Sequence, residues 1–244
     1  MVLLHGLFGS GSNLGSLARS LQDRYSVYSV DLPNHGRSDW LPQIDLHNMA
    51  LSLEQWMTHH QLTDACLVGH SLGGKLAMQL ALGAPQRVRA LVIADIAPVV
   101  YGALHDNVLA ALQAVAAMSC TSRQAAMQEM VNIIDDPGVV QFLLASLRRG
   151  EDGFYRWRFD VEGITRDYHR LREAPAAVGA YQGPVQFIKG GDSDYIQAHH
   201  RAHILALFPQ TQLKVMPGCG HWLHVQQPRL FNSLVGRFID AHSN

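Results

Sequence analysis

The sequence has few cysteines, no excess of charge of either sign and no long hydrophobic run. Its three cysteines, Cys66, Cys120 and Cys219, are odd in number and far apart, which argues against a disulfide framework and provides no metal-ligand spacing. The formal net charge of −1 gives no electrostatic reason to bind nucleic acid or an anionic membrane. No apolar run approaches the roughly 18 residues that cross a bilayer, and no signal peptide is visible. These absences indicate a soluble protein of a reducing compartment, which we expect to be the cytoplasm.

The order of apolar segments predicts an α/β fold with a mostly parallel, doubly wound sheet. Strand-like runs alternate with segments in which apolar residues recur every three or four positions. The runs lie at residues 2–4, 25–30, 65–68, 88–94, 185–188 and 212–216. Strands joined by helices in this way imply right-handed crossovers and a sheet covered on both faces. At 244 residues, of which 48% are hydrophobic, the chain is long enough to bury such a core.

The alternation stops between the fourth and fifth of these runs. From about Ile96 to Gly183 the spacing is helical, with no convincing strand, which predicts an all-helical insertion before the last two strands. We therefore expect a core of residues 1–95 and 184–244 and an insertion of residues 96–183. The insertion is interpreted as a lid over the carboxyl edge of the sheet, the alternative being an unrelated small helical domain. Its aromatic residues Phe154, Tyr155 and Trp157 could line a substrate pocket or form the core of the lid.

A sharp strand-to-helix turn is predicted at residues 69–74, which read Gly-His-Ser-Leu-Gly-Gly. The glycines at 69 and 73 leave room for the strand and the helix to cross closely. The N–H groups at the start of the helix favour developing negative charge at the same place. Ser71 is therefore the candidate nucleophile, and an ordinary turn with a capping serine is the alternative.

A serine nucleophile needs a base, an acid that orients the base, and donors for the oxyanion, in the chain order Ser, Asp, His. His221, in a Gly-rich loop after the last strand, is the candidate base, and His224, expected in the final helix, is the weaker candidate. Three aspartates that follow strands could be the acid, and their positions leave the choice open: Asp95, Asp192 and Asp194. The backbone N–H groups of Leu7 and Leu72 are the candidate oxyanion donors.

Five motifs follow one another along the chain. They are residues 5–10 (His-Gly-Leu-Phe-Gly-Ser), 31–38 (Asp-Leu-Pro-Asn-His-Gly-Arg-Ser), 69–75 (Gly-His-Ser-Leu-Gly-Gly-Lys), 95–98 (Asp-Ile-Ala-Pro) and 220–224 (Gly-His-Trp-Leu-His). Together they resemble the α/β-hydrolase superfamily, and more narrowly the small bacterial YbfF-type esterases and their mitochondrial relatives. The resemblance covers essentially the whole chain. It implies a carboxylesterase that favours short acyl chains and uses no metal or organic cofactor.

The resemblance also bears on the acid. In that group the Asp of the Asp-Ile-Ala-Pro motif, here Asp95, is the expected triad member, and we favour it over Asp194. Many other α/β-hydrolases take the acid from a Gly-x-x-Asp turn, which Gly191 to Asp194 fits. The leading hypothesis is a serine carboxylesterase that acts on a small-molecule ester. A thioesterase or C–C hydrolase could use the same triad, and a non-hydrolytic receptor could use the same fold.

The start of the chain departs from the group. Its members usually have ten or more residues before the strand equivalent to residues 2–4, and a sheet edge without them is an aggregation liability. We therefore expect a late start codon or a trimmed chain. The sequence assigns no substrate-binding residue, no metal ligand and no oligomeric state.

Overall fold

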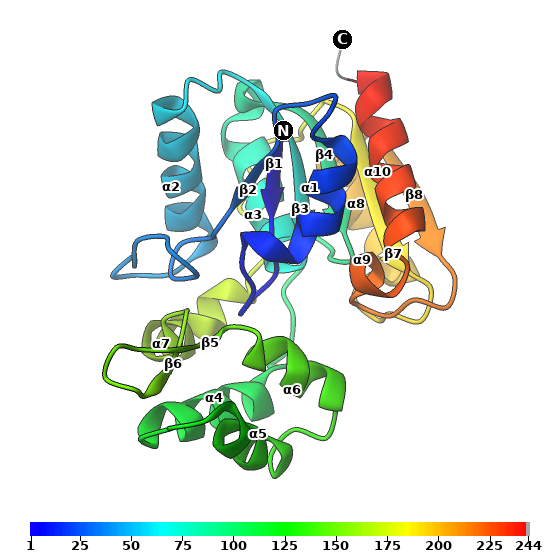
Figure 1. Cartoon of the computed structure of the whole chain (residues 1–244). Coiled ribbons are helices and arrows are strands. Elements are labelled where there is room, and N and C mark those ends of the chain that lie inside the picture. Colours follow the sequence, from blue (N-terminus) through cyan, green and yellow to red (C-terminus); the bar gives the residue numbers. More distant parts are fainter. Residues whose placement is uncertain (243–244) are drawn as a thin grey trace.

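A computed structural model describes residues 1–242, in which one sheet with helices on both faces stands above a smaller insertion (Figure 1). The elements outside the insertion are β1 (Val2–Leu4), α1 (Gly15–Leu21), β2 (Tyr28–Val30), α2 (Leu46–His59), β3 (Ala65–His70), α3 (Leu72–Gly83), β4 (Val88–Ala94), β7 (Val185–Gly190), α8 (Arg201–Leu207), β8 (Thr211–Met216), α9 (Leu223–Gln226) and α10 (Pro228–His242). Short 3-10 helices precede α1, β4 and α8, at Gly11–Leu14, Pro85–Arg87 and Ala198–His200.

The strands form one parallel sheet in the order β2-β1-β3-β4-β7-β8. This order confirms the predicted α/β fold with a doubly wound sheet. Because the strands run in one direction, their carboxyl ends meet at a single edge, which faces the insertion in Figure 1. Ligands of open α/β sheets bind at this edge. The fold therefore places the loops after β1, β3, β4, β7 and β8 around one region.

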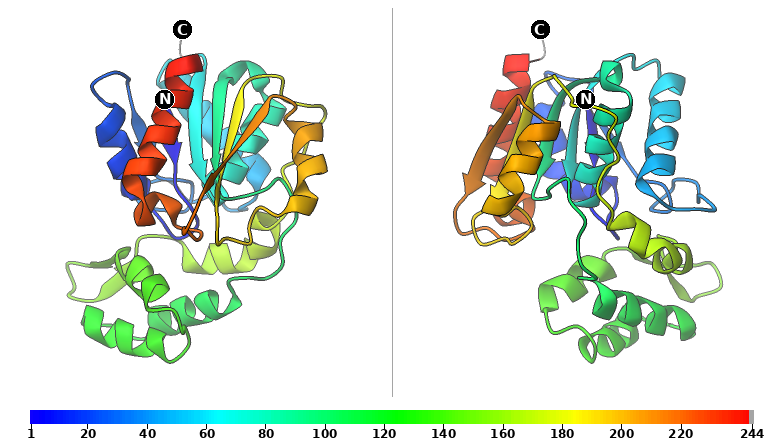
Figure 2. Two further views of the ribbon diagram at one scale, coloured as in Figure 1. Left: turned by 90° about the vertical axis from the view of Figure 1, so that its right-hand side faces the viewer. Right: turned by 180° about the vertical axis from the view of Figure 1, so that it is seen from behind.

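Each face of the sheet is covered by its own set of helices. Leu17 and Leu21 of α1 and Phe231 and Val235 of α10 are buried in one apolar cluster. The other cluster contains buried residues of α2, α3 and α8, among them Leu76. Figure 2 shows α1 and α10 side by side on one side of the sheet. The inner strands β1, β3 and β4 between these layers are mostly apolar and buried, as expected for parallel strands covered on both faces, whereas the edge strand β8 is largely exposed.

The segment of residues 96–183, here called the insertion, lies between β4 and β7. It contains α4 (Asp106–Ala117), α5 (Arg123–Val131), α6 (Pro137–Leu144), β5 (Leu147–Arg149), β6 (Tyr155–Trp157) and α7 (Val161–Leu171). The expectation that it is all-helical is wrong in one respect, because β5 and β6 pair as an antiparallel hairpin. Leu147 lies within the segment whose spacing is helical, but it pairs with Trp157. The side chains of β6 alternate between half-buried and exposed, which is the period of a strand.

The end of the insertion is held against α3. The Lys75 ammonium donates to the backbone carbonyls of Arg172 and Glu173, at 2.7 and 2.6 Å. One turn further along α3, the Gln79 side chain donates to the carbonyl of Ala176 and accepts from its N–H. Burial lowers the pKa of Lys75 to about 7. These bonds fix the return of the insertion beside the helix that begins after Ser71.

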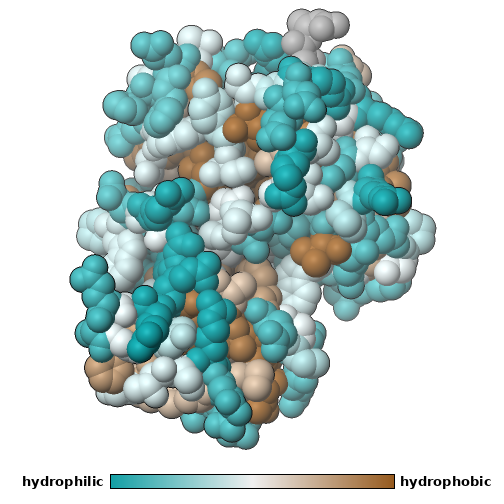
Figure 3. All heavy atoms as spheres, in the orientation of Figure 1, coloured by the Kyte–Doolittle hydropathy of each residue, from teal (hydrophilic) through white to brown (hydrophobic). Residues whose placement is uncertain are grey.

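The face drawn in Figure 3 is mostly hydrophilic or neutral, and hydrophobic residues gather in its lower part, over the insertion. Among residues 1–242, no helix has both the length and the apolar character that a membrane crossing requires. The expectation of a late start codon or a trimmed chain stays a prediction.

Candidate active site

Ser71 lies at the bend between β3 and α3, with a backbone geometry that few residues adopt. Its φ of 52° and ψ of −119° are strained for a residue with a side chain. The bend is held by the Ser71 N–H, which donates to the carbonyl of Ala94 at the end of β4 (3.0 Å). This conformation is that of a nucleophile elbow, in which the hydroxyl is presented at the carboxyl edge of the sheet.

Two glycines permit the close crossing of β3, α3 and β1 at this bend. A Cβ atom on Gly69 would lie 2.3 Å from the carbonyl oxygen of Gly73, and one on Gly73 would lie 2.3 Å from that of Leu4. Real Cβ atoms do not approach backbone atoms so closely. The close crossing that the glycines at 69 and 73 predict is therefore present.

Asp95 directly follows β4 and is completely buried, with a φ of 53°. One carboxylate oxygen, Oδ1, accepts the N–H of Gly190 at 2.9 Å. The other, Oδ2, accepts the Ser193 hydroxyl and the Nδ1–H of His221, the latter at 2.8 Å. A buried carboxylate requires such partners, because an unpaired charge in the interior is costly.

The His221 ring is held from several directions. In addition to the Asp95 bond, it stacks on Tyr195, with ring centroids 3.9 Å apart and planes at 20°. The His70 ring lies 4.7 Å from it on centroids, and Nε2 of His70 donates to the backbone carbonyl of His221 at 2.9 Å. With Nδ1 bonded to Asp95, the ring has its Nε2 left to exchange a proton.

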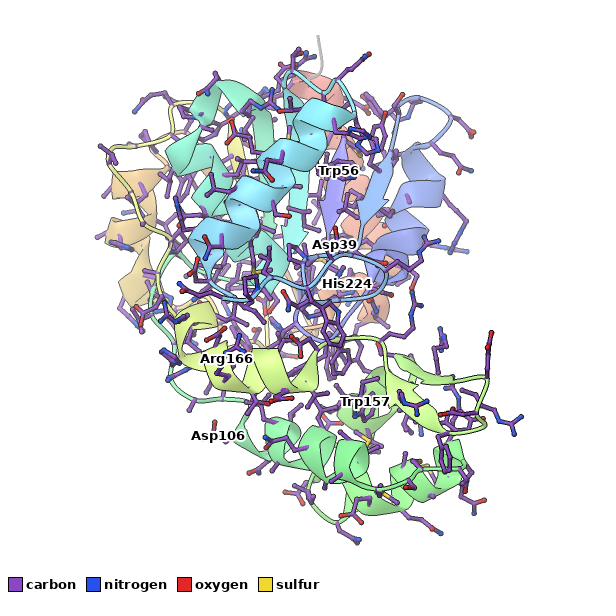
Figure 4. The ribbon with its side chains drawn as sticks, turned by 90° about the vertical axis from the view of Figure 1, so that its left-hand side faces the viewer. Asp39, Trp56, Asp106, Trp157, Arg166 and His224 are labelled. Atoms are coloured by element: carbon purple, nitrogen blue, oxygen red, sulfur yellow. The ribbon has the colours of Figure 1, made fainter. Side chains whose placement is uncertain are left out.

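The other candidates for acid and base lie elsewhere. Asp192 and Asp194 are exposed, and Asp194 accepts a hydrogen bond from Gln197. His224 was expected in the final helix, but it is buried in α9, just before that helix, with its ring 4.4 Å from His70. Burial lowers its pKa to about 4. Figure 4 labels His224 at the edge of the core that faces the insertion. The geometry therefore brings Asp95, and neither of the other two aspartates, to His221.

The two candidate oxyanion donors are backbone groups near Ser71. Leu72 is the first residue of α3, so its N–H has no partner within the helix. Leu7 lies in the loop after β1, and within residues 1–242 no group accepts a hydrogen bond from either amide. Leu7 and Ser71 line the same cavity, described below. This arrangement leaves both amides available to a ligand.

Two buried histidines hold the loop that carries Leu7. His5 donates from Nδ1 to the Gly6 carbonyl and accepts the Leu32 N–H at Nε2. His35 donates from Nδ1 to the Pro33 carbonyl and accepts the Phe8 N–H at Nε2. Accepting at Nε2 requires a neutral imidazole, and burial lowers the pKa of His5 to about 3 and that of His35 to about 4.

Two hollows meet at Ser71. A cavity of about 390 Å³, here called the large cavity, lies between the core and the insertion. Its lining includes His221 and Trp222 of the core and Val139 and Phe142 of α6. A recess of about 40 Å³, here called the small recess, is lined by Ser71 and by residues that include Leu72, Lys75, Tyr101, Tyr168 and Leu171. Within residues 1–242, no group of three or more His, Cys, Asp or Glu side chains is arranged to hold a metal ion.

Several residues that shape the site were not identified from the sequence. Ser193 lies between the two aspartates that were weighed as acids, yet its own hydroxyl contacts Asp95. Tyr195, two residues later, stacks on His221. His70 and His35 were read as parts of motifs and were assigned no role of their own. For these two histidines, the available signal in the sequence was their place within the motifs, because each bonds to the backbone of a loop near Ser71.

Comparisons with known proteins identify the family of the chain. The family model described as "Alpha/beta hydrolase family" matches residues 1–234. Esterase YbfF of Escherichia coli is 38% identical over 241 residues, covering 98% of this chain and 92% of the relative. The sn-1-specific diacylglycerol lipase ABHD11 of Mus musculus is 35% identical, covering 98% of this chain and 80% of the relative. The solved structure of a marine microorganism esterase superposes with a TM-score of 0.94 at 34% identity, covering 97% of this chain and 94% of that one. The chain therefore belongs to the alpha/beta hydrolase family, and these relatives are esterases and a lipase.

Proposed function

We propose that the chain is a serine carboxylesterase in which Ser71 is the nucleophile, His221 the base and Asp95 the acid. The observation that carries this proposal is the 2.8 Å hydrogen bond from Nδ1 of His221 to the buried Asp95 carboxylate. His221 and Ser71 line the same cavity, so the imidazole and the hydroxyl face one ligand space. The relatives that match over nearly the whole chain carry esterase and lipase names, which supports the same class of reaction.

The proposed reaction forms and then hydrolyses an acyl-enzyme. The Ser71 oxygen attacks the ester carbonyl carbon while its proton passes to Nε2 of His221. The resulting oxyanion accepts hydrogen bonds from the Leu7 and Leu72 amides, each typically worth on the order of 3 kcal/mol to the transition state. The ester C–O bond then breaks, and the alcohol oxygen takes the proton from Nε2. A water molecule then loses a proton to the same nitrogen and attacks the acyl carbon. The bond between this carbon and the Ser71 oxygen breaks, Nε2 returns the proton to that oxygen, and the acid is released. Asp95 stabilises the imidazolium that forms in each half.

We further propose that the acyl group is short and that the insertion acts as a lid. The resemblance to YbfF-type esterases implied short acyl chains. The small recess beside Ser71, at about 40 Å³, supports this because a space of roughly 10–15 Å³ holds one water-sized group. Val139 and Phe142 of the insertion line the large cavity above the sheet edge, as residues of a lid would.

All three cysteines are buried and none forms a disulfide within residues 1–242, which supports a reducing compartment such as the cytoplasm.

The test is turnover of p-nitrophenyl esters by the wild type and by Ser71→Ala. We expect wild-type hydrolysis of the acetate and butyrate, a decline toward the octanoate, and no turnover above background by the variant. Mass spectrometry after a brief reaction with the acetate should find an acetyl group on Ser71. A wild type no faster than Ser71→Ala would instead favour a receptor on the same fold.

A further inference from the structure

The large cavity and the small recess differ in which part of the proposed machinery they contain. Both are lined by Ser71 and Leu7, so an ester carbonyl at Ser71 has access to each. His221 lines the large cavity and is absent from the lining of the small recess. Leu72, whose amide is a proposed oxyanion donor, lines the small recess and does not line the large cavity. An ester bound at Ser71 therefore has the proposed base on the side of the large cavity and a proposed oxyanion donor on the side of the small recess.

Proton transfer from His221 to the leaving alcohol determines on which side of Ser71 the alcohol half of a bound ester lies. When the C–O bond breaks, the alcohol oxygen must receive a proton from Nε2 of His221, and a general acid acts within hydrogen-bond reach. The alcohol must then leave on the side that His221 lines. We propose, on the basis of the proposed function, that the acyl group occupies the small recess and the alcohol occupies the large cavity, so that the enzyme selects esters of a small acid with a bulky alcohol.

The small recess is built to keep its size. The Lys75 ammonium in its wall is bonded to two backbone carbonyls. The Tyr101 hydroxyl accepts the Ala97 N–H and donates to the carbonyl of Tyr195. The Tyr168 hydroxyl shares a hydrogen bond of 2.6 Å with Nδ1 of His105. Walls whose polar ends are tied in this way resist moving apart, so extra acyl carbons meet fixed atoms.

The large cavity offers about ten times the volume, and much of its wall is apolar. Leu104, Val108, Val139 and Leu143 contribute aliphatic surface, and Phe142 contributes an aromatic ring that packs against Trp222, with centroids 5.7 Å apart. Such a lining suits an aliphatic or aromatic alcohol of six or more carbons, which buries apolar surface there.

A pair of constitutional isomers tests this assignment with the wild-type protein. Hexyl acetate and ethyl hexanoate have the same atoms and reverse the long and the short side of the ester. One methylene that a pocket cannot hold costs about tenfold or more in kcat/KM. We therefore expect hexyl acetate to be hydrolysed on the order of tenfold faster in kcat/KM. A preference below threefold, or one for ethyl hexanoate, overturns the assignment.

Two variants change one hollow each. Leu171→Ala removes side-chain volume from the small recess and should raise kcat/KM for ethyl hexanoate relative to hexyl acetate. Val139→Phe fills part of the large cavity and should lower kcat/KM for hexyl acetate relative to ethyl acetate. If circular dichroism shows that Leu171→Ala does not fold, Val139→Phe alone tests the assignment. A kcat/KM for hexyl acetate that stays unchanged or rises relative to ethyl acetate in Val139→Phe contradicts it. Ethyl acetate separates the two hypotheses: turnover by the wild type and none by Ser71→Ala upholds the esterase, whatever the isomers show.

Discussion

Replacing Asp95 by asparagine changes one atom of the carboxylate and should reverse the hydrogen-bond roles at His221. In the native site Oδ1 accepts the Gly190 N–H, while Oδ2 accepts from Ser193 and from Nδ1 of His221. The Gly190 amide can only donate, so it holds the asparagine oxygen on its side. The amide NH₂ then faces Nδ1 of His221, which must turn into an acceptor. The imidazole proton moves to Nε2, and that nitrogen can no longer accept the Ser71 proton.

The expected loss in the Asp95→Asn variant is large. A serine protease whose imidazole is set in the wrong tautomer loses about 10⁴ in kcat. A factor of 10⁴ corresponds to about 5.4 kcal/mol of transition-state stabilisation. We expect a loss of this order in kcat for p-nitrophenyl acetate at pH 7.5, with little change in the melting temperature, because the substitution preserves volume.

Asp194→Asn is the matched control, since Asp194 is exposed and its carboxylate contacts Gln197. It should retain kcat within about twofold. Full activity in Asp95→Asn together with a large loss in Asp194→Asn would refute the tautomer argument and restore the Gly-x-x-Asp turn as the source of the acid.

The remaining predictions concern Ser193 and the buried histidines. Ser193→Ala removes a donor to a charged group, typically worth about 1.5–3 kcal/mol, so kcat should fall about tenfold or more with KM unchanged, and an unaltered kcat contradicts a positioning role. In the folded chain, burial lowers the pKa of His5 to about 3 and that of His35 to about 4, from the ordinary value of 6.5. Between the folded-state pKa and pH 6.5 the unfolded chain binds more protons than the folded chain. The contribution of each neutral histidine to the free energy of unfolding is therefore complete above about pH 6.5 and decreases as the pH falls, by about 2 kcal/mol per histidine at pH 5. Urea unfolding at pH 7 and pH 5 measures this change, which should be smaller in His35→Gln, and equal stability at both pH values contradicts it.

The elements that follow from local patterning were predicted well. The apolar run before Ser71 and the helical spacing after it are β3 and α3, and the glycines between them lie at a close backbone crossing. The β5–β6 hairpin was missed because each of its strands has three residues, too few for a period of two to stand out against helical spacing. Pairing across the hairpin, which joins Leu147 to Trp157, overrode the helical spacing of this part of the sequence.

The roles of the histidines outside the triad could not be predicted in the same way. His5 and His35 are 30 positions apart, and each gains its function by accepting an amide from the loop of the other: His5 from Leu32, and His35 from Phe8. Whether an imidazole donates, accepts or titrates depends on its burial and its partners. Neither property can be read from a short motif.

The sequence by itself determined the α/β alternation and the sharp turn at Ser71, because each of these depends on neighbouring residues. The tertiary structure decided which aspartate meets His221, since Asp95 and Asp194 both follow strands of one sheet and differ in what surrounds them. β4 ends in the interior, where Asp95 finds Gly190, Ser193 and His221 around it, whereas Asp194 points into solvent from an exposed turn. Contacts between residues more than ninety positions apart made that choice, and they exist only in the folded chain.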